Sequence, residues 1–277
     1  MIRARKRFGQ HFLEPVWRAR VAEACAIGPE DDIVEIGPGT GALTEFLVAH
    51  AHRVLAIEVD RDLGAALAAR NLAALRVHVG DVLHRGIDGV LDAWLGSEPT
   101  RRFRVAGNLP YNITSPILAL LARWASARPG LVDATVMVQA EVADRLTAVP
   151  STSDYGVLTL TTALRADVRR LLDLPPGAFR PRPKVASALV RLSYRPPPPG
   201  VVHPALISRL VRAAFMQRRK TLANALKPLA AADGLDPAAA IAAAGLDGRR
   251  RPETLQLLEF SALADRWAAS ATVHPVL

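Results

Sequence analysis

The chain has 277 residues, half of them hydrophobic, which is enough for one large domain or two unequal ones. Its 35 Lys and Arg against 26 Asp and Glu leave a net charge of +9, as expected of a protein that meets nucleic-acid phosphates, although codon usage in a GC-rich genome would favour a similar composition. The single cysteine, Cys25, excludes an internal disulfide, and no apolar run reaches about 18 residues, so we expect a cytosolic protein with no membrane span and no export.

The N-terminal segment is basic over residues 3–7 and aromatic or apolar over residues 8–13. A basic terminus is often solvated, but the apolar residues that follow favour a segment that lies on the body of the protein. A helix is predicted over residues 15–26, where apolar side chains recur at helical spacing.

A glycine-rich turn follows the first predicted strand, Asp32 to Ile36. It reads Gly37-Pro38-Gly39-Thr40-Gly41 and precedes a helix predicted over residues 44–51. Such a turn lets the backbone approach a nucleotide-type ligand, but the spacing differs from the G-x-G-x-x-G of dinucleotide enzymes. Glu35, just before the turn, is suited to hold a ligand's ammonium group, or is a solvated strand-end carboxylate.

The next two predicted strands, residues 53–58 and 76–79, also end at carboxylates, with a helix over residues 63–71 between them. Glu58 stands where a carboxylate would bind two ribose hydroxyls. Asp81 could accept a hydrogen bond from the amine of a cofactor adenine. No cluster of His, Cys and Asp has metal-ligand spacing, so we predict no metal site.

A fourth predicted strand begins at Phe103 and ends in Gly107-Asn108-Leu109-Pro110-Tyr111-Asn112. The Asn108 side-chain oxygen and a main-chain carbonyl of Leu109 or Pro110 could accept the two N–H bonds of an aromatic amine, while Tyr111 stacks on its ring. Such acceptors would aim the nitrogen lone pair at an electrophile without a strong base. Asn and Pro are also common in ordinary turns between a strand and a helix.

These strand ends share one position in the predicted fold. The carboxyl ends of parallel strands meet at one edge of a sheet, which is the binding edge of such folds. Gly37, Glu58, Asp81 and Asn108 therefore point together to one site more specifically than any of them does alone.

The chain continues with predicted helices over residues 115–125 and 141–148, strands over 133–139 and 187–192, and a helix followed by a strand over 157–172. The loop over residues 175–184 carries one aromatic residue, Phe179, among Arg180, Arg182 and Lys184. This arrangement suits a nucleobase stacked beside phosphates, and equally a phenylalanine that fills the core under a proline-stiffened loop.

A proline-rich linker at residues 195–200 precedes a segment that is predicted to be all helical. The helices are predicted over residues 204–217, 220–229, 237–244 and 254–269. Two basic clusters, residues 217–221 and 248–251, favour an RNA-facing surface, although solvated helix ends would account for either one.

Six segments together make the chain resemble the ribosomal RNA adenine N6,N6-dimethyltransferases, specifically the kasugamycin-sensitivity type that acts on small-subunit (16S) rRNA. They are residues 5–13, 35–39, 107–112, 139–142, 179–185 and 215–222. The resemblance implies an α/β fold, with a Rossmann-like S-adenosylmethionine-dependent methyltransferase sheet in residues 1–198 and a smaller all-helical rRNA-binding domain in residues 199–277.

The resemblance also implies the chemistry. S-adenosyl-L-methionine would be the methyl donor, and two adjacent adenosines in a loop near the 3′ end of the rRNA would each receive two methyl groups during ribosome biogenesis. The partner would be small-subunit rRNA in the immature 30S subunit, and the protein a cytoplasmic monomer.

Site residues are carried over by position. Cofactor contacts would come from His11, Leu13, Gly37, Glu58, Asp81 and Asn108, and contacts to the target base from Asn108, Leu109, Pro110, Tyr111 and Phe179. The family usually has Asn at the position of His11, so a side-chain contact made there is in question, whereas a backbone contact would survive.

Three other classes of protein share part of this pattern. A macrolide-resistance methyltransferase of large-subunit (23S) rRNA shares the cofactor half, but Leu109 and the 217–220 signature favour the small-subunit type. A non-catalytic ribosome-assembly or transcription factor is disfavoured by the intact Asn108 and Tyr111. A dinucleotide dehydrogenase is disfavoured by the glycine spacing.

Overall fold

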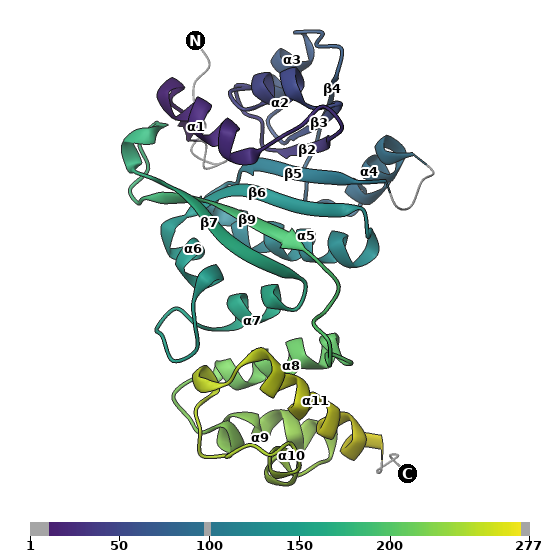
Figure 1. Cartoon of the computed structure of the whole chain (residues 1–277), viewed down its shortest axis with the longest axis vertical. Coiled ribbons are helices and arrows are strands. Elements are labelled where there is room, and N and C mark those ends of the chain that lie inside the picture. Colours follow the sequence, from purple (N-terminus) through teal and green to yellow (C-terminus); the bar gives the residue numbers. More distant parts are fainter. Residues whose placement is uncertain (1–10, 97–100, 273–277) are drawn as a thin grey trace. The chain divides into compact units, whose positions relative to one another are not determined.

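The computed structural model describes residues 11–96 and 101–272, and its contacts divide the chain into two compact units (Figure 1). The sheet unit comprises Met1–Ala143 and Asp167–Arg195, and the helical unit comprises Asp144–Ala166 and Pro196–Leu277. The basic cluster predicted at residues 3–7 lies outside the described residues. No helix in the described part of the chain is long and apolar enough to cross a membrane.

The sheet unit is built on a seven-stranded sheet with the order β4-β3-β2-β5-β6-β9-β7. The strands are β2 (Asp32–Ile36), β3 (Arg53–Glu58), β4 (Leu75–Val79), β5 (Phe103–Asn108), β6 (Leu131–Gln139), β7 (Ala166–Leu174) and β9 (Ser187–Tyr194). The first five are parallel, and β9 runs antiparallel to β6. Because β2 lies between β3 and β5, the ends of three predicted strands meet at one edge, as expected.

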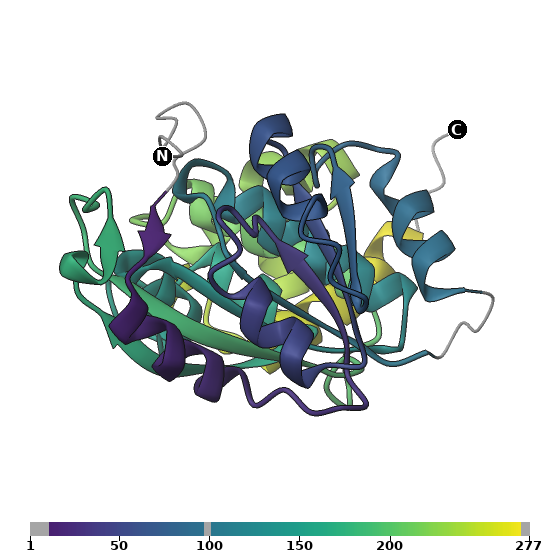
Figure 2. The same ribbon diagram turned by 90° about the horizontal axis from the view of Figure 1, so that it is seen from above.

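Helices α1 (Pro15–Cys25) and α2 (Thr44–His50) pack on one face of the sheet, where their buried side chains meet residues of the central strands (Figure 2). The other helices of this unit are α3 (Arg61–Ala68), α5 (Thr114–Ala127) and α4 (Ile87–Leu95), and α6 (Ala140–Thr147) crosses into the helical unit. Helix α4 was not predicted, although its apolar residues recur at helical spacing and become buried.

A two-stranded sheet joins the N-terminal segment to the proline-rich loop. In it β1 (Phe12–Leu13) runs antiparallel to β8 (Phe179–Arg180), with Leu13 opposite Phe179. Neither strand was predicted, because two residues are too few to show a periodic pattern. The pairing places His11, immediately before β1, against residues more than 160 positions later in the chain.

The helical unit contains α7 (Val157–Ala163), α8 (Pro204–Met216), α9 (Leu222–Asp233), α10 (Pro237–Ala243) and α11 (Leu257–Thr272). The two units differ from the predicted division at 198/199, since residues 144–166 and 196–198 cluster with these helices. The reason is packing: Tyr155 and Leu160 are buried in the core of the helical unit, and the Tyr155 hydroxyl donates a 2.7 Å hydrogen bond to the Leu255 carbonyl.

Candidate active site

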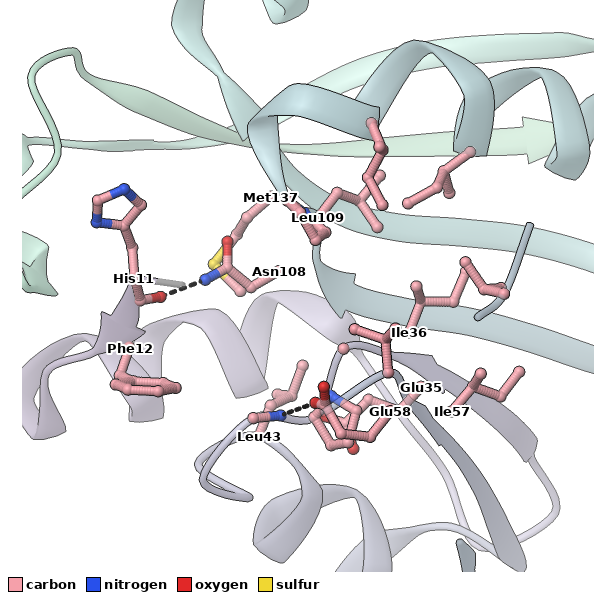
Figure 3. Close-up of a pocket in the computed structure, with 18 of the residues that line it drawn as sticks. His11, Phe12, Glu35, Ile36, Leu43, Ile57, Glu58, Asn108, Leu109 and Met137 are labelled. Carbon is pink, nitrogen blue, oxygen red and sulfur yellow. Dashed lines mark hydrogen bonds between the residues drawn. The ribbon is translucent and has the colours of Figure 1, made fainter. Parts of the chain in front are cut away.

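A cavity of about 270 Å³ lies at the carboxyl ends of the parallel strands (Figure 3). Nine of the predicted site residues line it: His11, Leu13, Gly37, Glu58, Asp81, Asn108, Leu109, Pro110 and Tyr111. Phe12, Glu35 and Met137 line it as well. The predicted meeting of strand ends at one edge is therefore confirmed in the geometry, and a single hollow connects them.

The glycine turn folds back onto the end of β3. Gly37 adopts a φ of +69°, which favours glycine, and its N–H donates a 3.0 Å hydrogen bond to the Ile57 carbonyl. Gly39 has a φ of +59°, and a Cβ there would lie 3.1 Å from the Phe12 ring. Phe12 thus packs closely over the turn, a contact that sequence reasoning missed because β1 was not predicted.

Glu58 is held in place by the turn and by its own strand end. The Gly39 N–H donates to Oε2 and the Asp60 N–H donates to Oε1, both at 2.9 Å. Burial raises the pKa of Glu58, and these two hydrogen bonds oppose that shift. Because each carboxylate oxygen can accept more than one hydrogen bond, Glu58 keeps acceptor capacity for a ligand.

Glu35 lies at the end of β2 and is almost completely buried, with 1% of its surface exposed. The Thr44 hydroxyl donates a 2.6 Å hydrogen bond to its carboxylate. Burial raises the pKa of Glu35 to about 8, and the nearby charge of Glu58 acts in the same direction. Because Glu35 is buried, its interpretation as a solvated strand-end carboxylate is wrong.

The electrostatics of the cavity favour a cation. Glu35, Glu58 and Asp81 line it, and its lining, as far as the structure describes it, contains no Lys or Arg. The raised pKa of Glu35 keeps this carboxyl mostly protonated near pH 7 in the donor-free protein, where it can accept a hydrogen bond from a cation without adding a negative charge. Asp81 is exposed, and one of its oxygens accepts a 2.8 Å hydrogen bond from the Leu83 N–H.

Asn108 ends β5 at a point where two strands approach closely. A Cβ on the preceding Gly107 would lie 2.3 Å from the Ile36 carbonyl oxygen, so a larger residue would push β5 away from β2. The Asn108 side-chain nitrogen donates a 2.7 Å hydrogen bond to the His11 carbonyl (Figure 3). That contact assigns the amide's orientation and leaves Oδ1 as the acceptor.

The structure distinguishes the main-chain carbonyls of Leu109 and Pro110, either of which could accept the second N–H bond of an amine. The Pro110 carbonyl accepts hydrogen bonds from the Ile113 N–H at 3.1 Å and from the Thr114 hydroxyl at 3.0 Å. The Leu109 N–H donates to the Met137 carbonyl at 3.1 Å, but no hydrogen bond to the Leu109 carbonyl occurs among the described residues. The Leu109 carbonyl is therefore the better second acceptor.

Tyr111 contacts two residues from distant parts of the chain. Its hydroxyl lies 2.6 Å from the Ser187 hydroxyl, and its ring stacks on the His11 ring with centroids 5.4 Å apart and planes at 24°. Sequence reasoning missed Ser187, which lies 76 positions after Tyr111 in the chain.

The comparisons with known proteins agree with this geometry. Residues 1–260 match the family model described as "Ribosomal RNA adenine dimethylase". The chain belongs to the ribosomal RNA adenine dimethylase family. A relative from Pseudomonas savastanoi pv. phaseolicola, named "Ribosomal RNA small subunit methyltransferase A", is 42% identical over 270 residues, covering 95% of this chain and 94% of its own length.

Two solved structures share the fold of this dimethylase family member. A dimethyladenosine transferase from Plasmodium falciparum superposes with a TM-score of 0.72 at 24% identity, covering 91% of this chain and 96% of that one. The 23S rRNA methyltransferase ErmE gives a TM-score of 0.64 at 25% identity, covering 93% of this chain and 99% of that one. The family and the fold are those of S-adenosylmethionine-dependent methyltransferases, as the resemblance implied.

One predicted site residue of the dimethylase is not in the cavity. Phe179 is 1% exposed and packs in the core with Leu13 and Ala178, and it is not among the lining residues. The structure thus agrees with the second interpretation, a core phenylalanine under the proline-rich loop. Its pairing partner, Leu13, fixes it there.

Each of the two basic clusters in the dimethylase's helical unit contains both a paired arginine and an exposed one. Arg218 pairs with Glu253 at 2.6 Å and donates to the carbonyls of Thr152 and Ser153, whereas Arg219 is exposed. The second cluster divides in the same way.

In that cluster Arg250 pairs with Glu259 and donates a 2.7 Å hydrogen bond to the Thr254 carbonyl, while Arg251 is exposed. The exposed cations, and not the paired ones, are the better candidates for phosphate contacts. Within the described residues, no group of three His, Cys, Asp or Glu is arranged to hold a metal ion.

Proposed function

We propose that this protein transfers methyl groups from S-adenosyl-L-methionine to the N6 amines of two adjacent adenosines near the 3′ end of small-subunit rRNA, in the immature 30S subunit. The observation that carries the proposal is the orientation of Asn108, whose nitrogen is held by His11 so that its oxygen remains to accept a hydrogen bond from an amine. The name of the 42% identical relative supports the small-subunit substrate.

The donor fits the chemistry of the cavity. It carries a methyl group on a sulfonium sulfur and brings a second positive charge on its ammonium, and the lining offers carboxylates and no Lys or Arg among the described residues. Glu58 would bind the ribose hydroxyls, Asp81 the adenine amine, and Glu35 the ammonium. His11, Leu13 and Gly37 would add contacts around it.

The target amine is positioned by two acceptors. Asn108 Oδ1 and the Leu109 carbonyl would each accept one N–H bond and hold the nitrogen away from the plane of the purine ring. Its lone pair is then less delocalised and points toward the electrophile, and the positive charge that develops on nitrogen meets two oxygen dipoles. Tyr111 would stack on the adenine after it leaves its own stack in the RNA.

The second methyl group requires a change of contacts. A monomethylated amine has one N–H left, so it can use only one of the two acceptors at a time. The amine must therefore rotate about its bond to the ring before the second transfer. We expect this rotation to occur in the cavity without the help of a further residue.

The rival substrate is large-subunit rRNA. The relative named for the small subunit is 42% identical, whereas ErmE is 25% identical, so the similarity favours the small subunit. The test is mass mapping of methyladenines after incubation of unmethylated small and large subunits with labelled donor. Two adjacent dimethyladenosines in the small subunit support the proposal, and methylation of the large subunit alone overturns it.

We also expect the protein to be a monomer located in the cytoplasm. A monomer should elute at the mass of one chain in size-exclusion chromatography with light scattering. A cytoplasmic location stays a prediction of the sequence, to be checked by cell fractionation.

A further inference from the structure

Tyr111 is held at its hydroxyl by a residue of the sheet. The Ser187 hydroxyl lies 2.6 Å from the Tyr111 hydroxyl, and Ser187 is 1% exposed. Ser187 begins β9, where it stands opposite Gln139 of β6, and β9 has a neighbouring strand on each side. A hydroxyl in this position cannot follow a moving tyrosine, so it acts as a fixed anchor.

Tyr111 is also held at its ring. The His11 ring stacks on it with centroids 5.4 Å apart, and His11 Nδ1 lies 2.6 Å from the Pro181 carbonyl, which accepts a hydrogen bond from it. The main-chain carbonyl of the same histidine receives the Asn108 amide. His11 therefore contacts both side chains that face the target base, one through its backbone and one through its ring.

We propose that Ser187 and His11 are positioning residues that hold the Tyr111 ring as a preformed stacking platform for the target adenine. This inference rests on the proposed function. Stacking of a base on an aromatic side chain favours binding, but a ring that must first be ordered gives up part of that stacking energy. Two fixed contacts remove this cost before the RNA arrives.

The chemistry of the phenol suits a permanent anchor. Burial raises the pKa of Tyr111, and the hydrogen bond with Ser187 opposes the shift. The phenol therefore stays neutral near pH 7 and keeps its hydrogen, so the contact with Ser187 persists through the working range.

A double-mutant cycle tests the Ser187 contact. Tyr111→Phe keeps the ring and removes its hydroxyl, and Ser187→Ala removes the partner. Methyl transfer to unmethylated small subunits should fall about fivefold to tenfold in kcat/KM for each variant, as for one hydrogen bond, and no further in the double variant. Ser187→Thr, which keeps a hydroxyl, should restore most of the rate.

Two other measurements separate a positioning role from damage to the fold. Donor affinity measured by calorimetry and the thermal midpoint should stay at the wild-type values in all four proteins. Losses that multiply in the double variant, or that follow donor affinity or the midpoint, would overturn the role of Ser187.

His11 is tested by two substitutions that leave its main-chain carbonyl in place. His11→Ala removes the ring and should raise the KM for the subunit about fivefold, whereas His11→Phe keeps a ring for stacking but loses the hydrogen bond to the Pro181 carbonyl, so it should raise the KM by less than His11→Ala does. A faster His11→Ala enzyme would mean that the ring covers the face the base needs, and would overturn the role of His11.

The wild-type protein in the same assay separates this inference from the function on which it rests. If wild type incorporates no methyl groups into the small subunit, the proposed function fails. If wild type is active and Ser187→Ala and His11→Ala match it, only the platform fails.

Discussion

The side-chain nitrogen of Asn108 donates a 2.7 Å hydrogen bond to the main-chain carbonyl of His11, which lies 97 positions earlier in the chain. An asparagine amide can face a ligand with either its donor or its acceptor end, and only the acceptor end helps a nucleophilic amine. The carbonyl oxygen of His11, in the N-terminal segment, therefore fixes the orientation of the Asn108 amide at the end of β5.

The first prediction concerns the Asn108 amide. Asn108→Ala should reduce methyl transfer by about 100-fold or more, because a preorganised acceptor at the reacting nitrogen is lost. Donor affinity should remain within about tenfold of wild type, as measured by calorimetry.

Asn108→Asp is the sharper variant of the same test. It keeps the acceptor but turns a carboxylate oxygen toward the His11 carbonyl, so it should fail like the alanine variant. Unimpaired turnover in either variant would remove the oriented amide from the mechanism.

The second prediction concerns the pH dependence of stability. Because burial raises the pKa of Glu35 to about 8 from an ordinary 4.5, the folded protein retains a proton that the unfolded chain has lost between these values. Stability of the donor-free protein should therefore fall as pH rises through this window, by about 1.4 kcal/mol per pH unit from this group alone.

Glu35→Gln isolates this contribution. The glutamine variant cannot titrate, so its free energy of unfolding relative to wild type should improve steadily from pH 5 to pH 8 and level off above. Urea unfolding at closely spaced pH values measures the difference. A gap that stays constant with pH would show that Glu35 is ionised in the folded protein.

The third prediction separates two adjacent arginines. Arg218→Ala should destabilise the helical unit by about 1–3 kcal/mol, because the carbonyls of Thr152 and Ser153 and the Glu253 carboxylate lose their charged partner. Arg219→Ala should leave unfolding within about 0.5 kcal/mol of wild type.

Measurements of rRNA binding by the Arg218 and Arg219 variants complete this test. Arg219→Ala should weaken rRNA binding and lower the slope of log affinity against log salt by about one, if Arg219 meets a phosphate. Equal effects of the two variants on unfolding would contradict the division between a paired and an exposed arginine.

The fourth prediction concerns Phe179. Phe179→Ala should lower the free energy of unfolding by about 3–5 kcal/mol, because a fully buried ring is removed from the core beside Leu13. Phe179→Leu should recover most of that loss. If Phe179 instead stacks on the base, the alanine variant would keep its thermal midpoint and lose methyl transfer alone.

The binding edge of the sheet unit could be predicted from the residue order alone. The turn at Gly37 and the residues Glu58, Asp81 and Asn108 follow strands whose parallel order obliges their ends to meet, and all four line one cavity. Local pattern was sufficient here because each strand end is specified by the few residues around it.

Which atoms face the cavity, and which residues are structural, could be seen only in the folded chain. The orientation of Asn108, the burial of Phe179, the pairing of Arg218 and the place of residues 144–166 all depend on partners that lie far away in the chain. A hydrogen bond or a packed ring requires two groups within a few ångströms of each other, and residue order alone does not specify that distance.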